Sequence, residues 1–167
     1  VLVVADYSQI ELRILAHMSK DEAMIQIFRS GGDIHRGTAS EVFGVPLEQV
    51  DATMRSAAKA VNFGIVYGIS DFGLSNNLKI PRSKAKEYIE KYFQRFSGVR
   101  AFMDECVQSA KAQGYVETMM KRRRYVPQIA SKNYNVRSFG ERLFKLSLQL
   151  LNLEGFLKPA LTKRWQE

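Results

Sequence analysis

The sequence is short of cysteine and of long apolar runs, and both shortages limit what the protein can be. Its only cysteine, Cys106, excludes an internal disulfide, and its place on an apolar helical face indicates a buried structural thiol. The chain has no apolar run of about 18 residues and no charged-then-apolar leader, so it supports neither membrane spanning nor secretion. We expect a cytoplasmic protein that binds no membrane and forms no oligomer.

Positive charge is in excess and is unevenly distributed. The 167 residues carry a formal net charge of +8, with 46% hydrophobic and 25% charged residues, which is typical of one globular domain. Residues 1–54 contain four Lys/Arg against eight Asp/Glu, and residues 55–167 contain 21 against 9, a net charge of +12. A metal-binding N-terminal part followed by a body facing nucleic acid would give this distribution, as would chance.

The pattern of apolar residues predicts an α+β protein that is mostly helical. Residues 1–5 form a short β-branched run of the kind found in a buried strand. Residues 85–96 and 99–110 repeat apolar positions at helical spacing, so we expect an antiparallel helix pair whose aromatic side chains belong to the core. Residues 115–119 and 123–126 predict a small β-ribbon.

Several helix ends are marked in the sequence. Residues 19–22 read SKDE, a match to the capping box, and Asp33 follows two glycines as a cap for the next helix. Gly68 and Gly114 are expected to end helices, because glycine adopts the left-handed conformation common after a last helical turn.

Residues 55–68, which read RSAAKAVNFGIVYG, carry cations and rings in a fixed order. Arg55, Lys59, Phe63 and Tyr67 recur every four residues, so on a helix they form one stripe about 18 Å long. Arginine and lysine bind phosphate, and the two rings offer stacking surfaces, which suits a nucleoside triphosphate. An ordinary amphipathic helix with solvated charges has the same spacing, so the spacing alone leaves both interpretations open.

Two motifs carry a family resemblance. The pattern Arg-x3-Lys-x3-Phe-Gly-x2-Tyr-Gly of residues 55–68 resembles the fingers-helix motif of family A DNA polymerases, the DNA polymerase I type. Residues 6–13, DYSQIELR, resemble a second motif of that family, in the family's order. The resemblance runs from residue 1 to about residue 142. It implies four parts: 1–50, a palm strand with the first motif and following helices; 51–113, fingers helices; 114–142, a basic β-ribbon and duplex-contact region; and 143–167, a divergent C-terminal helix.

The resemblance implies a site for Mg²⁺ and the nucleotide sugar in residues 6–13. Asp6 is similar to the carboxylate that binds both of the two Mg²⁺ ions expected in a complete polymerase, and the Tyr7 carbonyl to a further ligand. Without the resemblance, Asp6 at a strand end is equally a helix cap. Glu11 stands where the family has the steric gate that selects deoxyribose, and Gln9 lies beside it in the dNTP site.

The resemblance also implies how the triphosphate and base are bound. Arg55, Lys59 and His35 would neutralise the triphosphate, and Lys59 would also donate a proton to the pyrophosphate leaving group. Phe63 and Tyr67 would shape the base and template site, and closure of the helix would report correct pairing. A lone histidine such as His35 is otherwise usually structural.

A run of cations predicts contact with DNA. Residues 121–124 read KRRR in the turn of the predicted ribbon, and Arg122, Arg123 and Arg124 are candidates for the DNA backbone, a solvated basic loop being the alternative. The family usually has glycine where Lys121 stands. By resemblance, Asn133, Arg137 and Arg142 would follow the primer–template duplex through phosphate and minor-groove contacts.

Beyond residue 142 the chain departs from the family pattern. Leu146 and Leu150 stand where the family has Asn and Gln, and either a local reading-frame slip or true divergence would give this result. The family's downstream His-Asp-Glu segment is also missing, since His17 precedes Met18 and His35 precedes Arg36. We therefore expect part of a template-directed DNA polymerase that is inactive alone. The alternative is a non-catalytic basic helical module that binds DNA, or a decayed remnant.

Overall fold

The computed structural model describes residues 8–118 and 121–133, and within them the protein is mostly helical with one small antiparallel sheet. The predicted α+β class is therefore confirmed, while the strand predicted over residues 1–5 lies outside the described residues. No helix in the described part has the length and apolarity needed to cross a membrane. The elements are α1 (Ile10–Ser19), α2 (Glu22–Arg29), α3 (Ile34–Phe43), the 3-10 helix η1 (Leu47–Gln49), α4 (Ala52–Val66), α5 (Asp71–Leu78), α6 (Arg82–Arg95), α7 (Ser97–Gln113), β1 (Tyr115–Glu117), β2 (Arg123–Tyr125) and the 3-10 helix η2 (Pro127–Ala130).

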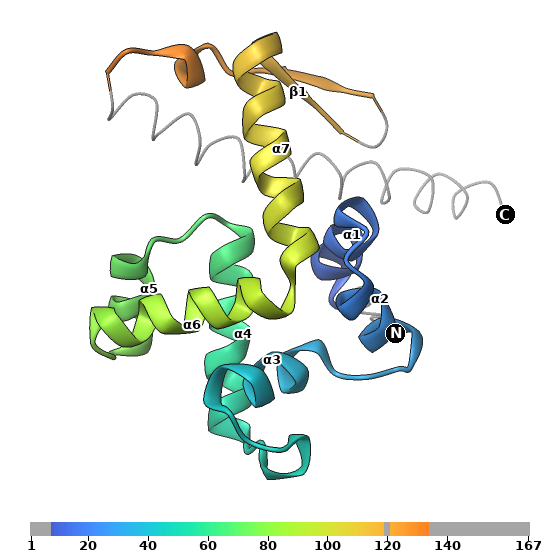
Figure 1. The fold of residues 1–167 in the computed structure, drawn as a ribbon, viewed down its shortest axis with the longest axis vertical. Coiled ribbons are helices and arrows are strands. Elements are labelled where there is room, and N and C mark those ends of the chain that lie inside the picture. The colour runs from blue at the N-terminus through green and yellow to red at the C-terminus, as the bar shows by residue number, and fades with distance from the viewer. Residues whose placement is uncertain (1–7, 119–120, 134–167) are drawn as a thin grey trace, which may run out of the picture.

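Helix α7 is the long connector of the fold. Figure 1 shows it running from the cluster of helices α1–α6 to the β-ribbon. With 17 residues it is about 25 Å long at 1.5 Å per residue. The ribbon pairs Tyr115 with Tyr125 and Glu117 with Arg123, which confirms the predicted hairpin. Gly114 ends α7 in the left-handed conformation, at φ 75°, as expected from the sequence.

Helices α6 and α7 form a corner, so the antiparallel pair predicted for them is wrong (Figure 1). Phe96 is both the C-cap of α6 and the N-cap of α7, so it alone connects the two helices. An antiparallel pair of helices needs a loop of about two to five residues. Helix α6 packs instead on α5 and α3, and α7 packs on α1 and β1. The core role of the aromatic residues is confirmed, since Tyr88, Tyr92 and Phe96 are at most 5% exposed.

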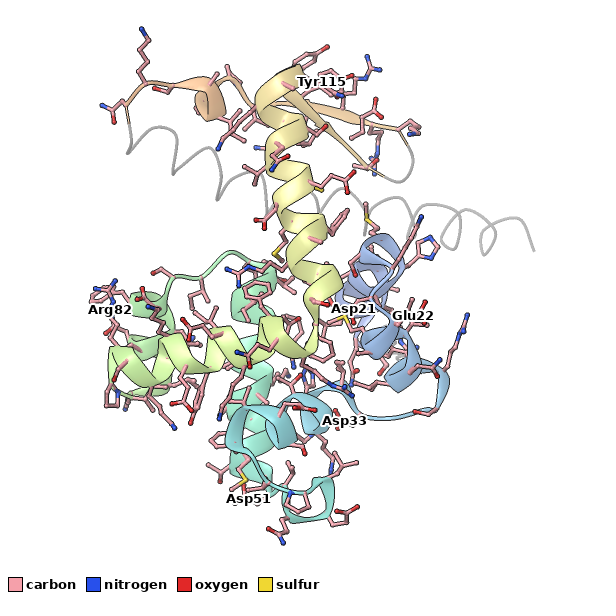
Figure 2. All side chains as sticks on the ribbon, in the orientation of Figure 1. Asp21, Glu22, Asp33, Asp51, Arg82 and Tyr115 are labelled. Atoms are coloured by element: carbon pink, nitrogen blue, oxygen red, sulfur yellow. The ribbon has the colours of Figure 1, made fainter. Side chains whose placement is uncertain are left out.

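Asp21 joins the start of α2 to the start of α7. Its Oδ1 accepts a hydrogen bond from Met24 N at 2.9 Å, and its Oδ2 accepts one from Gly98 N at 2.9 Å. Figure 2 labels Asp21 near the lower end of α7. The capping box predicted for residues 19–22 is wrong, because Lys20 takes a left-handed conformation that ends α1, and α2 begins only at Glu22. Asp21 is therefore the cap, and it is buried.

In the part of the chain that the structure describes, apolar side chains form one main core under α1–α7 and two smaller clusters. Cys106 packs beside the cluster under the ribbon, and burial raises the pKa of its thiol to about 11. The thiol is therefore protonated at neutral pH, which agrees with a structural role. The most buried members of the main core include Leu12, Met24, Ile34, Val42, Val61, Val66, Leu74, Tyr92, Phe96 and Val99.

Candidate functional site

Helix α4 separates an apolar face from the stripe of cations and rings. It begins at Asp51, whose Oδ1 accepts from Met54 N at 2.7 Å, and its helical residues run to Val66. Tyr67 is the C-cap, and its N–H donates to Phe63 O at 2.9 Å. The four-residue spacing of the stripe therefore continues through the final turn of the helix. The predicted helix is confirmed. Its opposite face is buried, with Ala58, Val61, Ile65 and Val66 at most 4% exposed.

The stripe is continuous in space. Lys59 Nζ lies 5.9 Å from the centre of the Phe63 ring, and the Phe63 and Tyr67 rings are 6.2 Å apart and inclined by 16°. Lys59 is exposed, Phe63 half-buried and Tyr67 40% exposed. A flat ligand with an anionic tail thus meets adjoining rings and a cation within one helix face.

Glu11 lies near the ring end of the stripe. Burial raises the pKa of the Tyr67 phenol, and the Glu11 carboxylate raises it further. Glu11 belongs to α1 and is half-buried. The structure therefore brings together two motifs that the sequence separates by more than 40 residues, since Glu11 of residues 6–13 is close enough to Tyr67 of residues 55–68 to raise the pKa of its phenol.

His35 enters the site from α3. Its ring centre lies 5.8 Å from that of Phe63, at an angle of 38°, and its side chain is only 2% exposed. Burial lowers the pKa of the ring, and the positive charges of Arg55 and Lys59 lower it further, against the opposing effect of Asp33. His35 is therefore neutral at neutral pH.

Asp33 is a functional candidate that the sequence patterns did not indicate beyond its role as a cap. Its Oδ1 accepts from His35 N at 2.9 Å, and its Oδ2 lies 2.6 Å from Arg55 Nε. Burial by itself would raise the pKa of this carboxyl, but the hydrogen bonds from Arg55 and from His35 N outweigh burial and lower it. Asp33 is thus an anion that holds the first cation of the stripe. Figure 2 labels it at the start of α3.

Two buried polar residues, Asn62 and Thr38, were also missed. Asn62 Nδ2 lies 3.0 Å from His35 Nδ1, and Thr38 Oγ1 donates to Asn62 Oδ1 at 3.1 Å. Asn62 is 0% exposed and Thr38 is 1% exposed. The sequence offered one signal for them: Asn62 stands among the apolar positions expected to be buried in α4. A buried polar side chain requires a hydrogen-bond partner, so a polar residue on a neighbouring helix could have been expected.

The remaining candidates of the first motif are only partly described. Gln9 is half-buried and precedes α1 in a left-handed conformation, at φ 55°, without a capping hydrogen bond from its side chain. Asp6 and Tyr7 lie outside the described residues. Within residues 8–118 and 121–133, no group of three or more His, Cys, Asp or Glu side chains is arranged to hold a metal ion.

The basic ribbon partly neutralises its own charge. Arg123 Nε lies 2.8 Å from Glu117 Oε1, its guanidinium sits 4.6 Å from the centre of the Tyr115 ring, and Lys121 Nζ is 3.6 Å from Glu117 Oε2. The backbone N–H of Arg122 donates to Thr118 Oγ1 at 3.2 Å.

The other DNA candidates lie on or near this ribbon. Arg122 and Arg124 are half-buried and Arg123 is exposed. Asn133 is exposed, and its backbone N–H donates to Ser131 Oγ at 3.2 Å. Arg137 and Arg142 lie outside the described residues. The ribbon begins at the end of α7 opposite its junction with α6, so it lies apart from α4 (Figure 1).

Comparison with solved structures gives the class of protein. The chain superposes with a TM-score of 0.83 and 41% identity on a structure described as the polymerase domain of Pol1 from M. smegmatis in complex with DNA primer–template and dNTP. The match covers 88% of this chain and 26% of that one. The fold is thus that of part of a nucleic-acid polymerase domain.

The sequence relatives give the family. The model for DNA polymerase family A matches residues 1–144, and the chain belongs to this family. It is 59% identical over 143 residues to DNA polymerase I of Streptococcus pneumoniae, and 59% identical over 141 residues to that of Geobacillus stearothermophilus. These matches cover 85% and 84% of the chain and 16% of each relative.

One relative extends the similarity past residue 144. DNA polymerase I of Caldicellulosiruptor bescii is 49% identical over all 167 residues, which are 20% of its length. The chain therefore spans about one fifth or less of the curated relatives that it matches.

Proposed function

We propose that this chain is the palm-and-fingers part of a template-directed DNA polymerase and that α4 binds the incoming dNTP. The observation that carries the proposal is the stripe of α4, in which Arg55, Lys59, Phe63 and Tyr67 follow one another beside His35. The similar Pol1 polymerase domain from M. smegmatis was solved with primer–template and dNTP, which supports the same two partners here.

The positive end of the stripe would hold the triphosphate. Arg55 offers a planar guanidinium suited to two phosphate oxygens, and Lys59 offers an exposed ammonium. Lys59 is also the proposed acid that protonates the departing pyrophosphate. Because His35 is neutral, it would contribute a hydrogen bond to the phosphates and no charge.

The ring end would hold the base, the sugar and the template. Phe63 and Tyr67 present adjoining faces for stacking, and Glu11 stands beside Tyr67, where it would crowd the 2′ position of a ribose. Gln9, the residue that precedes α1, is proposed as a further contact. Closure of α4 over a correct base pair would then bring the triphosphate to the primer end.

Mg²⁺ is proposed from the family resemblance alone, with Asp6 and the Tyr7 carbonyl as its ligands. Such an ion would neutralise phosphate oxygens during nucleotidyl transfer. The described residues contribute no cluster for it. Because the second carboxylate of the family pattern is not among the 167 residues, we propose that these residues alone polymerise poorly or not at all. Primer extension by the isolated chain that disappears with Asp6→Ala would contradict this.

The basic ribbon is proposed to contact the DNA backbone through Arg122, Arg123 and Arg124. Asn133, Arg137 and Arg142 are proposed to continue these contacts along the duplex. The charge of +12 over residues 55–167 also supports the second candidate function, a basic module that binds DNA without catalysis.

Mg²⁺-dependent dNTP binding separates the two functions. It would be measured on the full-length protein that contains this chain, with a dideoxy-terminated primer–template. We expect Arg55→Ala and Lys59→Ala each to weaken dNTP binding by about tenfold or more, because each removes a charge-assisted contact. Lys86→Ala removes an equal charge from the exposed face of α6 and should leave the affinity unchanged. Tight DNA binding without any dNTP binding would favour the non-catalytic module.

A further inference from the structure

Three buried polar side chains connect α3 to α4 through two hydrogen bonds. Thr38, Asn62 and His35 are 1%, 0% and 2% exposed. Thr38 Oγ1 donates to Asn62 Oδ1 at 3.1 Å, and Asn62 Nδ2 contacts His35 Nδ1 at 3.0 Å. In a buried setting each polar atom is costly unless it is paired, so these contacts stabilise one another.

The direction of the two hydrogen bonds determines where the histidine carries its proton. The Asn62 amide oxygen accepts the Thr38 hydroxyl, so the amide nitrogen faces the ring. An amide nitrogen can only donate, and His35 Nδ1 must therefore accept with its lone pair. The proton of the neutral ring is then on Nε2.

Most of the charged groups around His35 also favour a neutral ring. Arg55 and Lys59, both on α4, disfavour a second proton on the ring, and so does burial. Asp33, on the approach to α3, favours it but is itself paired with Arg55 at 2.6 Å. A ring that took a second proton would also present Nδ1–H to the donating amide nitrogen of Asn62.

We propose that Asn62, held by Thr38, is a positioning residue that keeps His35 in its Nε2–H form, so that the ring offers a neutral N–H donor to the triphosphate. The proposal rests on the proposed dNTP site. An apolar residue would fill the space of Asn62 in the core of α4, but it would leave His35 Nδ1 without a donor and the ring free to exchange its proton between the two nitrogens.

The main test asks whether Asn62 acts through His35. In the full-length protein with dideoxy-terminated primer–template, Asn62→Leu should weaken binding of dATP opposite a template dT by about three- to tenfold, the effect of one neutral hydrogen bond. The same change in a His35→Gln background should have little further effect. Equal losses in both backgrounds, or no loss in either, would overturn the proposal.

A pH profile gives a readout that a merely structural role would not change. Asn62→Asp places a carboxylate against Nδ1, which raises the pKa of His35 and favours a doubly protonated ring. The pH dependence of the dATP dissociation constant should then differ from that of the wild type, and His35→Gln should remove the difference. Asn76→Asp, the same change at an exposed position of α5, is the matched control. An identical profile for Asn62→Asp and wild type would contradict the proposal that residue 62 acts through His35 Nδ1.

Thr38 provides a second route if the Asn62 variants do not fold. Thr38→Val keeps the shape but removes the hydroxyl that orients the amide, so dATP binding should weaken, and Thr38→Ser should restore it. Equal affinities for Val, Ser and Thr at this position would overturn the proposal. Failure of the proposed function looks different, because the wild type itself would then show no Mg²⁺-dependent dATP binding that depends on Arg55 and Lys59.

Discussion

Arg55 Nε and Asp33 Oδ2 lie 2.6 Å apart, so the first cation of the α4 stripe is paired with the cap of α3. The same carboxylate group accepts from the backbone N–H of His35. One anion thus fixes both the guanidinium of Arg55 and the start of the helix that carries His35. A triphosphate that binds Arg55 must compete with Asp33 or share the guanidinium with it.

Asp33→Asn should destabilise the protein by about 0.5–1.5 kcal/mol, because asparagine still caps the helix but lacks the negative charge at the start of α3 and the partly exposed ion pair with Arg55. The pKa of Asp33 is lowered in the folded protein, so its ionic contribution is present above the unfolded pKa of about 3.9 and is lost as the pH falls through the lower folded value. Urea denaturation of the wild type and the variant between about pH 2 and 7 would show the difference shrinking in acid. A constant difference at every pH would contradict the assignment, and Glu48→Gln at an exposed position is the control.

His35 should make stability fall as the pH drops below about 6.5. Burial lowers the pKa of the folded ring, so between the folded value and the unfolded value of about 6.5 the unfolded chain binds more protons. Replacement by glutamine should remove this part of the pH dependence of the free energy of unfolding. The chain has only one other histidine, the exposed His17, and His17→Gln is the matched control. Equal effects of the two substitutions would contradict the burial argument.

The sequence predicted those parts of the site that depend on spacing along one helix. Arg55, Lys59, Phe63 and Tyr67 share a face because a helix repeats nearly every four residues, whatever it packs against. The partners of these residues could not be predicted in the same way. The bond from Asn62 to His35 spans 27 residues and the ion pair of Arg55 with Asp33 spans 22, so both depend on how α3 packs on α4.

Helix ends that depend on local conformation were predicted, and those that depend on distant partners were not. The end of α7 at Gly114 was predicted correctly, because the left-handed conformation after a last helical turn favours glycine whatever the rest of the fold. The cap of α2 was misassigned, since Asp21 is fixed partly by Gly98, a partner 77 residues away. The corner between α6 and α7 was also missed, because apolar spacing sets which face of a helix is buried but not the direction of the next helix.

Ile69 packs between two glycines, and we expect both glycines to be required. A Cβ at Gly64 would lie 2.7 Å from Ile69 Cγ2, and one at Gly73 would lie 2.8 Å from Ile69 Cγ1. Gly64→Ala and Gly73→Ala should each destabilise the protein by about 1–3 kcal/mol through overpacking at the α4–α5 corner. Thermal and urea denaturation would measure the loss.

A double substitution tests whether Ile69 is the cause. Ile69→Ala removes both clashing atoms, so Gly64→Ala should cost less in that background than in the wild type. Additive losses would locate the strain elsewhere. Gly37→Ala on α3 is the matched control, because its added Cβ would meet only the flexible end of Ile27, at 3.3 Å, and alanine favours the helix.

Lys121→Gly should stabilise the β-ribbon by about 0.5–1 kcal/mol. Lys121 has φ 59°, the left-handed region that glycine adopts without steric cost. The side chain of Lys121 is 83% exposed, and its ion pair with Glu117 at 3.6 Å is weak, so removing the side chain costs little stability.

Lys121→Ala is the control. It removes the same charge but keeps the unfavourable backbone conformation, and should be neutral or slightly destabilising. If glycine and alanine had the same effect on the free energy of unfolding, the lost charge and not the backbone conformation would be the cause.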